Sequence, residues 1–336
     1  MFVPEVTADF RPIERLIIQS QFSNLLTAAL EMRVFDHLPA TADGVTAHLG
    51  CRADVCARFL DVLAAIGLLE RRGDTYHNTP TAQEFLASTS PAYRGAELDL
   101  QQRHYETFSQ SITERMMHPD HKERDRTDTG WASRDALESL GNYALCGMLQ
   151  ESTAFITALP GFSGFRTMCD VGGNHGYYSM ALLDQNPGLT ATVCDLPSVA
   201  DTIRAFHAEK GYADRMTTRS MDLRTDDSLG ADYDLVFASH VLYGMHDAMD
   251  AILGKVTAAL TPGGWFVACH CARPEDEAWH PAQAFTEFLT VLSGYPTHHL
   301  DREVMLGHLH AAGLTNLHAQ VSPTTGILLL AGQKPA

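Results

Sequence analysis

Hydrophobic residues in the first part of the chain recur at the spacing of amphipathic helices. The pattern predicts helices over residues 13–35 and 41–50, the second capped by Thr41 and ended by Gly50. A third helix follows, and its apolar residues share one face: Phe59, Leu60, Val62, Leu63 and Ile66. Residues 71–77 then predict a tight hairpin. Two helices followed by a hairpin indicate a winged-helix fold.

From about residue 164 the pattern changes to short apolar runs that alternate with helical stretches. The runs typical of buried strands are 165–171, 190–195, 233–239 and 265–270. The helical stretches between them are 178–186, 198–210 and 248–260. This alternation predicts βαβ units and a parallel sheet. The end of the chain predicts a helix and two strands around a turn at 323–326, an antiparallel pair at the end of the sheet.

The change of pattern divides the chain into two expected domains, 1–158 and 159–336. The first is predicted to be a helical, winged-helix domain and the second an α/β domain. Residues 92–158 complete the helical part, with a polar interruption at 118–130 that we interpret as an insertion.

Charge and composition narrow the function of the winged helix. The 336 residues include 24 Lys and Arg against 41 Asp and Glu, a formal net charge of −17. This balance disfavours nucleic acid and anionic membranes as partners, because phosphate binding needs clustered basic residues. The winged helix is therefore expected to serve packing or dimerisation. No apolar run approaches the length of a membrane span, and no secretory signal or disulfide framework is evident, so we expect a cytoplasmic protein.

The glycine-rich stretch DVGGNHG, residues 170–176, follows a predicted strand and precedes a predicted helix. Its glycines allow a tight turn and a close approach of the backbone to a ligand. Acids end three successive predicted strands: Asp170, Asp195 and Asp222. Three acids with no Lys to hold a phosphate favour a cationic adenosine ligand such as S-adenosylmethionine (SAM), although capping acids in a Rossmann-like sheet would give the same pattern.

Three motifs of the second domain, DVGGNHG, DLPSV at 195–199 and AALTPGG at 258–264, resemble those of the small-molecule O-methyltransferases of plants and bacteria. Residues 29–38 and 59–86 resemble the N-terminal dimerisation domain of this caffeic acid and hydroxyindole O-methyltransferase family. The resemblance implies a Rossmann-like, seven-stranded class I methyltransferase domain behind a winged-helix dimerisation domain. It also implies a homodimer that uses SAM, releases S-adenosylhomocysteine (SAH) and methylates a small molecule.

By motif match, the resemblance implies one set of cofactor-binding residues. The set is Asp170, Gly172, Gly173, Gly176, Asp195, Leu196, Asp222, Leu223 and Ser239. The residues of the glycine-rich stretch would hold the methionine end of SAM. Asp195 and Leu196 would hold the ribose and flank the adenine, and Asp222 with Leu223 would hold the adenine.

The sequence departs from the family at the catalytic base. The family signature L-K-x-V-L-H-D-W corresponds to residues 238–247, where Tyr243 stands in the place of the base His and Gly244 in the place of the Asp. The Glu that orients the base in the family corresponds roughly to His298. The standard His–Glu dyad is therefore absent, and Tyr, with an ordinary pKa of about 10, is a poor base at neutral pH.

Three interpretations of this departure remain open. Another His acts as the base, or the substrate needs no strong base, or a metal ion is present. The candidates for the catalytic step are Tyr243, His240, His246 and His298. Histidines and Cys271 at strand ends could converge on a metal, but their spacings match no compact zinc motif, so no metal site is predicted.

The predicted substrate pocket lies between the N-terminal helices and the C-terminal loops, as in the family. Its candidate residues are His104, Tyr105, Met148, Phe288, Leu292 and Tyr295. The sequence thus predicts SAM-dependent methyl transfer to a small aromatic or heterocyclic metabolite, at oxygen. The alternatives are transfer to N, C or S of a heteroaromatic intermediate, or a SAM-binding homologue with a different activity.

Overall fold

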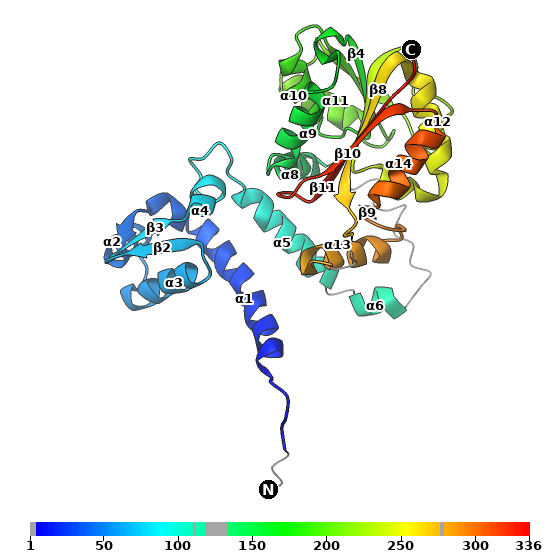
Figure 1. The fold of residues 1–336 in the computed structure, drawn as a ribbon. Helices are drawn as coiled ribbons and strands as arrows, with labels where there is room; N and C mark the ends of the chain where they lie inside the picture. The colour runs from blue at the N-terminus through cyan, green and yellow to red at the C-terminus, as the bar shows by residue number, and fades with distance from the viewer. Residues whose placement is uncertain (1–4, 110–111, 118–132, 276–278) are drawn as a thin grey trace. The chain divides into compact units, whose positions relative to one another are not determined.

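The computed structural model describes residues 5–109, 112–117, 133–275 and 279–336 (Figure 1). The chain forms two compact units that divide after Gln110, and each is described here by itself. Within the described residues, no helix combines the length and the apolar character needed to cross a bilayer.

The first unit contains the expected pair of helices and hairpin. Its helices are α1 (Arg11–Glu31), α2 (Ala42–Leu49), α3 (Ala53–Ala65), α4 (Pro80–Phe85) and α5 (Gly95–Ser109). Its strands are β1 (Ala40–Thr41), β2 (Leu69–Arg72) and β3 (Thr75–Asn78), which form an antiparallel sheet in the order β1-β3-β2. The two helices α2 and α3 with the hairpin β2–β3 match the winged-helix pattern.

Local chemistry sets the ends of the first helices. The side chain of Thr41 accepts a hydrogen bond from Gly44 N (3.2 Å) and caps α2, which ends at Gly50 with φ 62°. The expected helix 13–35 ends earlier, at Glu31, because Arg33 takes a left-handed conformation (φ 53°) and a short 3-10 turn follows.

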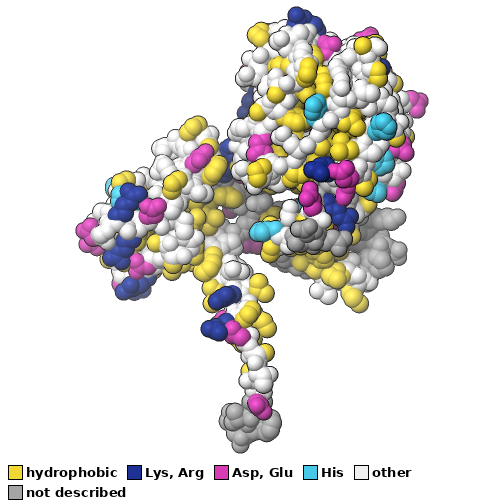
Figure 2. All heavy atoms as spheres, viewed as in Figure 1, with side chains coloured by type: hydrophobic (Ala, Val, Ile, Leu, Met, Phe, Trp, Pro, Cys, Tyr) yellow, Lys and Arg dark blue, Asp and Glu magenta, His cyan; other side chains and the backbone are white. Residues whose placement is uncertain are grey.

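Helix α1 leaves much of its apolar surface uncovered within its own unit. Its N-terminal half exposes large hydrophobic side chains: Phe10, Ile13, Leu16, Ile17 and Ile18. Leu16 is 68% exposed and Ile17 63% exposed. Figure 2 shows hydrophobic side chains along this helix. An exposed apolar stripe of this kind is typical of a surface that another protein chain covers.

The second unit alternates strands and helices. Its described helices are α6 (Ile112–Met117), α8 (Arg134–Ala144), α9 (Met148–Thr157), α10 (Tyr177–Gln185), α11 (Ala200–Glu209), α12 (Met249–Ala259), α13 (Pro281–Leu292) and α14 (Arg302–Ala311). Its strands are β4 (Thr167–Val171), β5 (Thr190–Asp195), β6 (Met216–Ser220), β7 (Tyr233–Ser239), β8 (Leu260–Ala272), β9 (His299–Leu300), β10 (Thr315–Val321) and β11 (Ile327–Gln333). The strand order is β10-β11-β8-β7-β4-β5-β6, and the two-residue β9 pairs with β8.

The sheet is parallel from β6 to β8 and antiparallel at β11 and β10, as the sequence predicts. Helices cover both of its faces: α9, α10 and α11 lie on one, and α12 and α14 on the other (Figure 1). Seven strands form the expected class I methyltransferase sheet, and β9 adds an eighth, short strand beside β8.

The division after Gln110 differs from the expected domain boundary at residue 158. Helices α8 and α9 pack into the core on one face of the large sheet, where Leu137 and Ile156 belong to the same cluster as Phe237 and Trp265. The helical pattern of residues 134–157 therefore marks helices of the second unit. The polar stretch 118–130 lies outside the described residues.

Candidate functional site

A cavity of about 550 Å³ lies in the second unit. It is lined by residues that follow β4, β5, β6 and β7, by one side of α13, and by the turn between β10 and β11. The parallel strands of the sheet present their carboxyl ends here, which is where open α/β sheets bind ligands.

The glycine-rich stretch after β4 packs too closely for side chains. A Cβ on Gly172 (φ 66°) would lie 2.5 Å from Val241 Cγ2, and one on Gly173 would lie 2.5 Å from Asp170 Cγ. Gly176 (φ 72°) begins α10 and would place a Cβ 2.6 Å from His207 Nε2. The glycines bring the backbone of residues 172–173 to the cavity wall.

Asp170 lies beneath this loop and does not line the cavity. Ser179 Oγ donates a hydrogen bond to its Oδ2 (2.7 Å), and Oδ1 has no hydrogen-bond partner among the described residues. Burial raises the pKa of Asp170 to about 7, against the opposing effect of the Ser179 hydrogen bond. Its side chain supports the turn from below.

Asp195, at the end of β5, faces the cavity with both carboxylate oxygens fixed. Asn174 N donates to Oδ2 (2.9 Å) and Leu196 N donates to Oδ1 (2.8 Å). Burial raises the pKa of Asp195, and these two backbone hydrogen bonds oppose that shift. His207 Nε2 lies 2.9 Å from Asn174 O and holds the same loop from behind.

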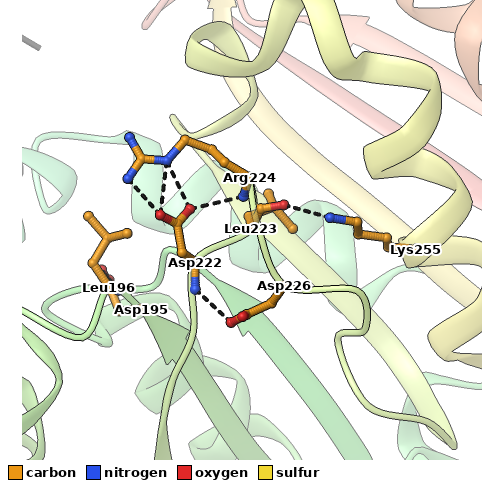
Figure 3. A network of polar contacts seen from close by, with 7 residues as sticks. All are labelled: Asp195, Leu196, Asp222, Leu223, Arg224, Asp226 and Lys255. Carbon is orange, nitrogen blue, oxygen red and sulfur yellow. Dashed lines mark hydrogen bonds and ion pairs between the residues drawn. The ribbon is translucent and has the colours of Figure 1, made fainter.

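Asp222 lies just after β6 and also lines the cavity, but its carboxylate already has a cationic partner. Arg224 Nε contacts both oxygens (2.8 and 3.1 Å) and one terminal nitrogen contacts Oδ2 at 2.7 Å. This arrangement lowers the pKa of Asp222. Figure 3 shows Asp195 and Leu196 beside this network, and Lys255 Nζ donating to Leu223 O (2.9 Å).

Histidines and a cysteine gather in the part of the cavity beyond β7 and β8. His240 follows β7, Cys271 lies near the end of β8, and His298 directly precedes β9. Their potential ligand atoms all lie within 4.8 Å of one another. Tyr243 packs against His298, with the ring centroids 5.2 Å apart.

Burial keeps these side chains uncharged. It lowers the pKa of His240 to about 4 and that of His298 to about 4, with neighbouring imidazoles adding to both shifts. It raises the pKa of the Cys271 thiol to about 12. His175, in the glycine-rich stretch after β4, has its pKa lowered to about 3 by burial. At neutral pH the four groups are neutral.

Glu287 and His299 form a carboxylate–imidazole pair next to this group. Glu287 Oε2, from α13, lies 2.8 Å from His299 Nδ1 and accepts a hydrogen bond from His298 N (2.8 Å). Burial tends to raise the pKa of Glu287, but the hydrogen bonds from His299 and His298 outweigh it and lower the pKa. Glu287 thus fixes the backbone of the segment that carries His298.

Most predicted site residues of the second unit line the cavity. They are Gly172, Gly173, Asp195, Leu196, Asp222, Leu223, Ser239, His240, Tyr243, His298, Met148 and Tyr295. Asp170 and Gly176 act from beneath the loop instead. His246 lies away from the cavity wall with a side chain that is 56% exposed, so the structure does not bring it to the site.

Two predicted pocket residues on α13, Phe288 and Leu292, lie outside the cavity wall. The helix faces the cavity with Ala282 and Gln283 and, one turn later, with Thr286. Tyr105 lies on α5 in the first unit, where its hydroxyl accepts from Gln101 Nε2 (3.2 Å). The side chain of His104 lies outside the described part of the structure.

Several lining residues were not predicted as part of the site. They are Asn174, His175, Tyr178, Cys194, Thr325 and Arg224. Asn174 and His175 lie inside the glycine-rich motif, so the motif itself could have indicated them. Thr325, in the turn between β10 and β11, carries no local signal that separates it from an ordinary turn residue.

Comparisons with known proteins agree with this architecture. Residues 15–88 match the family model of the O-methyltransferase dimerisation domain, and residues 147–297 match that of the O-methyltransferase domain. The chain is 30% identical to acetylserotonin O-methyltransferase of Mus musculus over 76% of this chain and 71% of that protein.

Two further proteins show the range of similarity. The N,N-dimethyltransferase OxyT of Streptomyces rimosus is 28% identical over 77% of this chain and 78% of its own length. The crystal structure of human N-acetylserotonin methyltransferase in complex with SAM superposes with a TM-score of 0.74 at 19% identity. That alignment covers 99% of this chain and 100% of the human chain, and it shows a common fold.

The buried carboxyl group of Asp170 predicts a particular dependence of stability on pH. Its pKa is about 7 in the folded chain, above the ordinary value of 3.8. Between these values the folded state holds a proton that the unfolded state releases. The free energy of unfolding therefore decreases as pH rises through this window, by up to about 4 kcal/mol.

Urea unfolding of the wild type and of Asp170→Asn across this pH window measures the effect. The wild type should lose stability relative to the variant as pH rises, since Asn has no proton to release. Ser179→Ala, which removes the hydrogen bond to the carboxylate, should enlarge the loss. A constant difference between the wild type and Asp170→Asn would contradict the prediction.

Proposed function

The chain belongs to the family of O-methyltransferases with an N-terminal dimerisation domain, and we propose that it transfers the methyl group of SAM to an oxygen of a small aromatic or heterocyclic metabolite. The observation that carries the proposal is a single cavity with two chemically distinct parts. One part is the glycine loop with Asp195 and Asp222, and the other is the group of neutral imidazoles around Tyr243. The two parts would hold the methyl donor and the acceptor next to each other.

The residues of the first part fit SAM. The backbone at Gly172 and Gly173 approaches the cavity without a side chain, which suits the methionine end of the cofactor. The Asp195 carboxylate, fixed by two backbone N–H groups, can still accept hydrogen bonds from two ribose hydroxyls. SAM supplies an electrophilic methyl group on a sulfonium, and the protein's own part is to orient the acceptor and exclude water.

Near the adenine position, the Asp222 carboxylate is already paired with Arg224. Because Arg224 occupies both oxygens of the carboxylate, we propose that Leu196 and Leu223 flank the adenine ring while Asp222 accepts from its amino group through a remaining lone pair. Ser239 completes the wall at the end of β7.

We propose that the acceptor binds among Met148, Tyr243, Tyr295 and His298. The rings of Tyr243 and Tyr295 meet edge to face, with centroids 5.4 Å apart, and provide an aromatic wall for a flat substrate. His246 is not part of this proposal, because its side chain lies outside the cavity. Transfer to nitrogen is the second candidate, since a relative of similar identity is named an N,N-dimethyltransferase.

We also propose that the enzyme works as a cytoplasmic homodimer. The dimerisation-domain match covers most of α1, whose uncovered apolar stripe is the surface that a second copy would bury. The seven cysteines are free thiols, and Cys169 and Cys194 share a hydrogen bond between their Sγ atoms (3.6 Å). Free thiols are usual in a reducing compartment.

Binding of SAH tests the cofactor assignment. Isothermal titration of the wild type should show saturable binding, and Asp195→Ala should weaken it by about 10- to 100-fold, the loss expected for one or two hydrogen bonds to a charged group. Asp195→Asn keeps a side-chain oxygen and should fall between the two. The control is Asp201→Ala, a neighbouring acid with a 95% exposed side chain. Undiminished affinity in a folded Asp195→Ala protein would refute the assignment.

The oligomeric state tests the role of α1. Light scattering coupled to size exclusion should give a dimer for the wild type and a monomer for Leu16→Glu, because a buried charge at the stripe has no partner. Val304→Glu adds the same charge at an exposed apolar residue of α14 in the second unit and should remain dimeric. A monomeric wild type, or a dimeric Leu16→Glu, would contradict the proposal.

A further inference from the structure

Three potential metal ligands from three separate elements converge in the acceptor part of the cavity. They are a ring nitrogen of His240, the Sγ of Cys271 and a ring nitrogen of His298, all within 4.8 Å of one another. A tetrahedral zinc site with metal–nitrogen distances of about 2.0–2.1 Å and a metal–sulfur distance of about 2.3 Å places its ligand atoms about 3.3–3.6 Å apart. Small side-chain rotations would close this difference.

The sheet fixes the backbones that carry these ligands. Strand β8 pairs in parallel with β7, where Ser239 lies opposite Cys269, and with β9, where His299 lies opposite Cys271. His240 and His298 are each one residue away from these pairs. Because the backbones belong to one hydrogen-bonded sheet, the three side chains are held together before any ion binds.

Both histidines have features that are common in metal ligands. His298 Nδ1 lies 3.2 Å from Thr290 Oγ1, which orients the ring and would make Nε2 the ligand atom. His240 Nε2 is buried and has no hydrogen-bond partner among the described residues. His240 also adopts a left-handed backbone conformation (φ 51°), fixed by donation of its N–H to Cys269 O (2.9 Å). For a residue with a side chain this conformation is unfavourable, and it is concentrated at functional sites.

Buried polar atoms without a hydrogen-bond partner in the described structure also lie beside this group. His270 is fully buried, its two ring nitrogens have no partner in the described structure, and its ring meets that of His240 at 5.9 Å between centroids. Buried nitrogen atoms are rarely left without partners, and such exceptions frequently mark an ion or water site.

We propose that His240, Cys271 and His298 bind a divalent transition-metal ion of the zinc class, with one coordination position open to the substrate. Two imidazoles and a thiolate are ligands that zinc and similar ions prefer over magnesium or calcium. Three protein ligands with an open fourth position are the arrangement of catalytic rather than structural zinc. His299 is not a ligand, because its Nδ1 is paired with Glu287.

Such an ion would take over the role of the absent His–Glu dyad, whose His acts as the base on the substrate hydroxyl in the family. A hydroxyl oxygen of the substrate would take the open position, and its proton would pass to solvent water as the O–H bond breaks. The bound ion would lower the pKa of the hydroxyl, as a metal ion lowers that of water from 15.7 to about 7. The oxygen then bonds to the methyl carbon while the carbon–sulfur bond breaks and its electron pair stays on sulfur. This catalytic role rests on the proposed methyl transfer, whereas binding of the ion does not.

Cobalt substitution tests the site without any assay of activity. The full chain is purified without a polyhistidine tag, depleted of metal with a chelator, and titrated with Co²⁺. We expect about one Co²⁺ per chain, with a thiolate-to-cobalt charge-transfer absorption and the intense visible bands of a tetrahedral site. Zn²⁺ should then displace Co²⁺ and abolish both absorptions.

Single substitutions test which residues bind Co²⁺ and produce the absorption. Cys271→Ser should lose the charge-transfer band, and Cys271→Ser and His298→Ala should each weaken Co²⁺ binding by more than about 100-fold. Thr290→Val removes only the partner that orients His298 and should weaken binding by about 10- to 100-fold. The controls are Cys146→Ser and His310→Ala, which alter an exposed thiol and an exposed imidazole elsewhere in the same unit and should leave the spectrum unchanged.

Titration with SAH on the metal-depleted protein separates this proposal from the proposed function. Saturable SAH binding without stoichiometric Co²⁺ binding would overturn the metal site and leave the methyltransferase assignment intact. Co²⁺ binding with the expected spectrum but no SAH binding would support the site and refute the cofactor assignment. A Co²⁺ spectrum that persists in both Cys271→Ser and His298→Ala would overturn the ligand assignment.

Discussion

Strand β4 pairs in parallel with β5 on one side and with β7 on the other, and β7 pairs in parallel with β8. Parallel strands end at the same edge of a sheet, so the residues that follow them are brought together whatever their separation in sequence. The glycine loop, Asp195 and His240 owe their proximity to this pairing. Helices on both faces bury the strands and keep the edge fixed, and the cavity is the space that the edge leaves open.

The two parts of the cavity differ in charge in a way that suits their proposed ligands. Asp195 and Asp222 supply negative charge where an adenosine with a sulfonium would lie. The imidazoles of His240 and His298 are neutral, because burial lowers the pKa of each to about 4. Burial therefore leaves these imidazoles unprotonated, the form in which a ring nitrogen can accept a hydrogen bond or bind a metal ion.

The features that could be predicted from the sequence are those that depend on residues close together in the chain. The glycine loop, the strands and the cap at Thr41 follow from residue types within a few positions of one another, and the structure contains each of them. The family motifs also predict the fold of the second unit.

What could not be predicted depends on contacts between distant segments. No spacing in the sequence indicates that Arg224 holds Asp222, or that Glu287 pairs with His299. The large residues Phe288 and Leu292 of α13 do not line the described cavity, whereas the smaller Thr286 does, and the sequence alone does not distinguish these two faces. The structure divides after Gln110 rather than at residue 158, because helical periodicity does not indicate which core a helix joins.

The two neighbouring histidines before and within β9 have opposite surroundings: His298 belongs to the group with Cys271, and His299 is bonded to Glu287. The register of the two-residue strand β9 against β8 separates these surroundings. Gain or loss of one residue in the connection from α13 would shift this register and turn each side chain to the opposite face, separating His298 from Cys271 and His299 from Glu287. The length of this short connection therefore constrains the site as much as the identity of its histidines does.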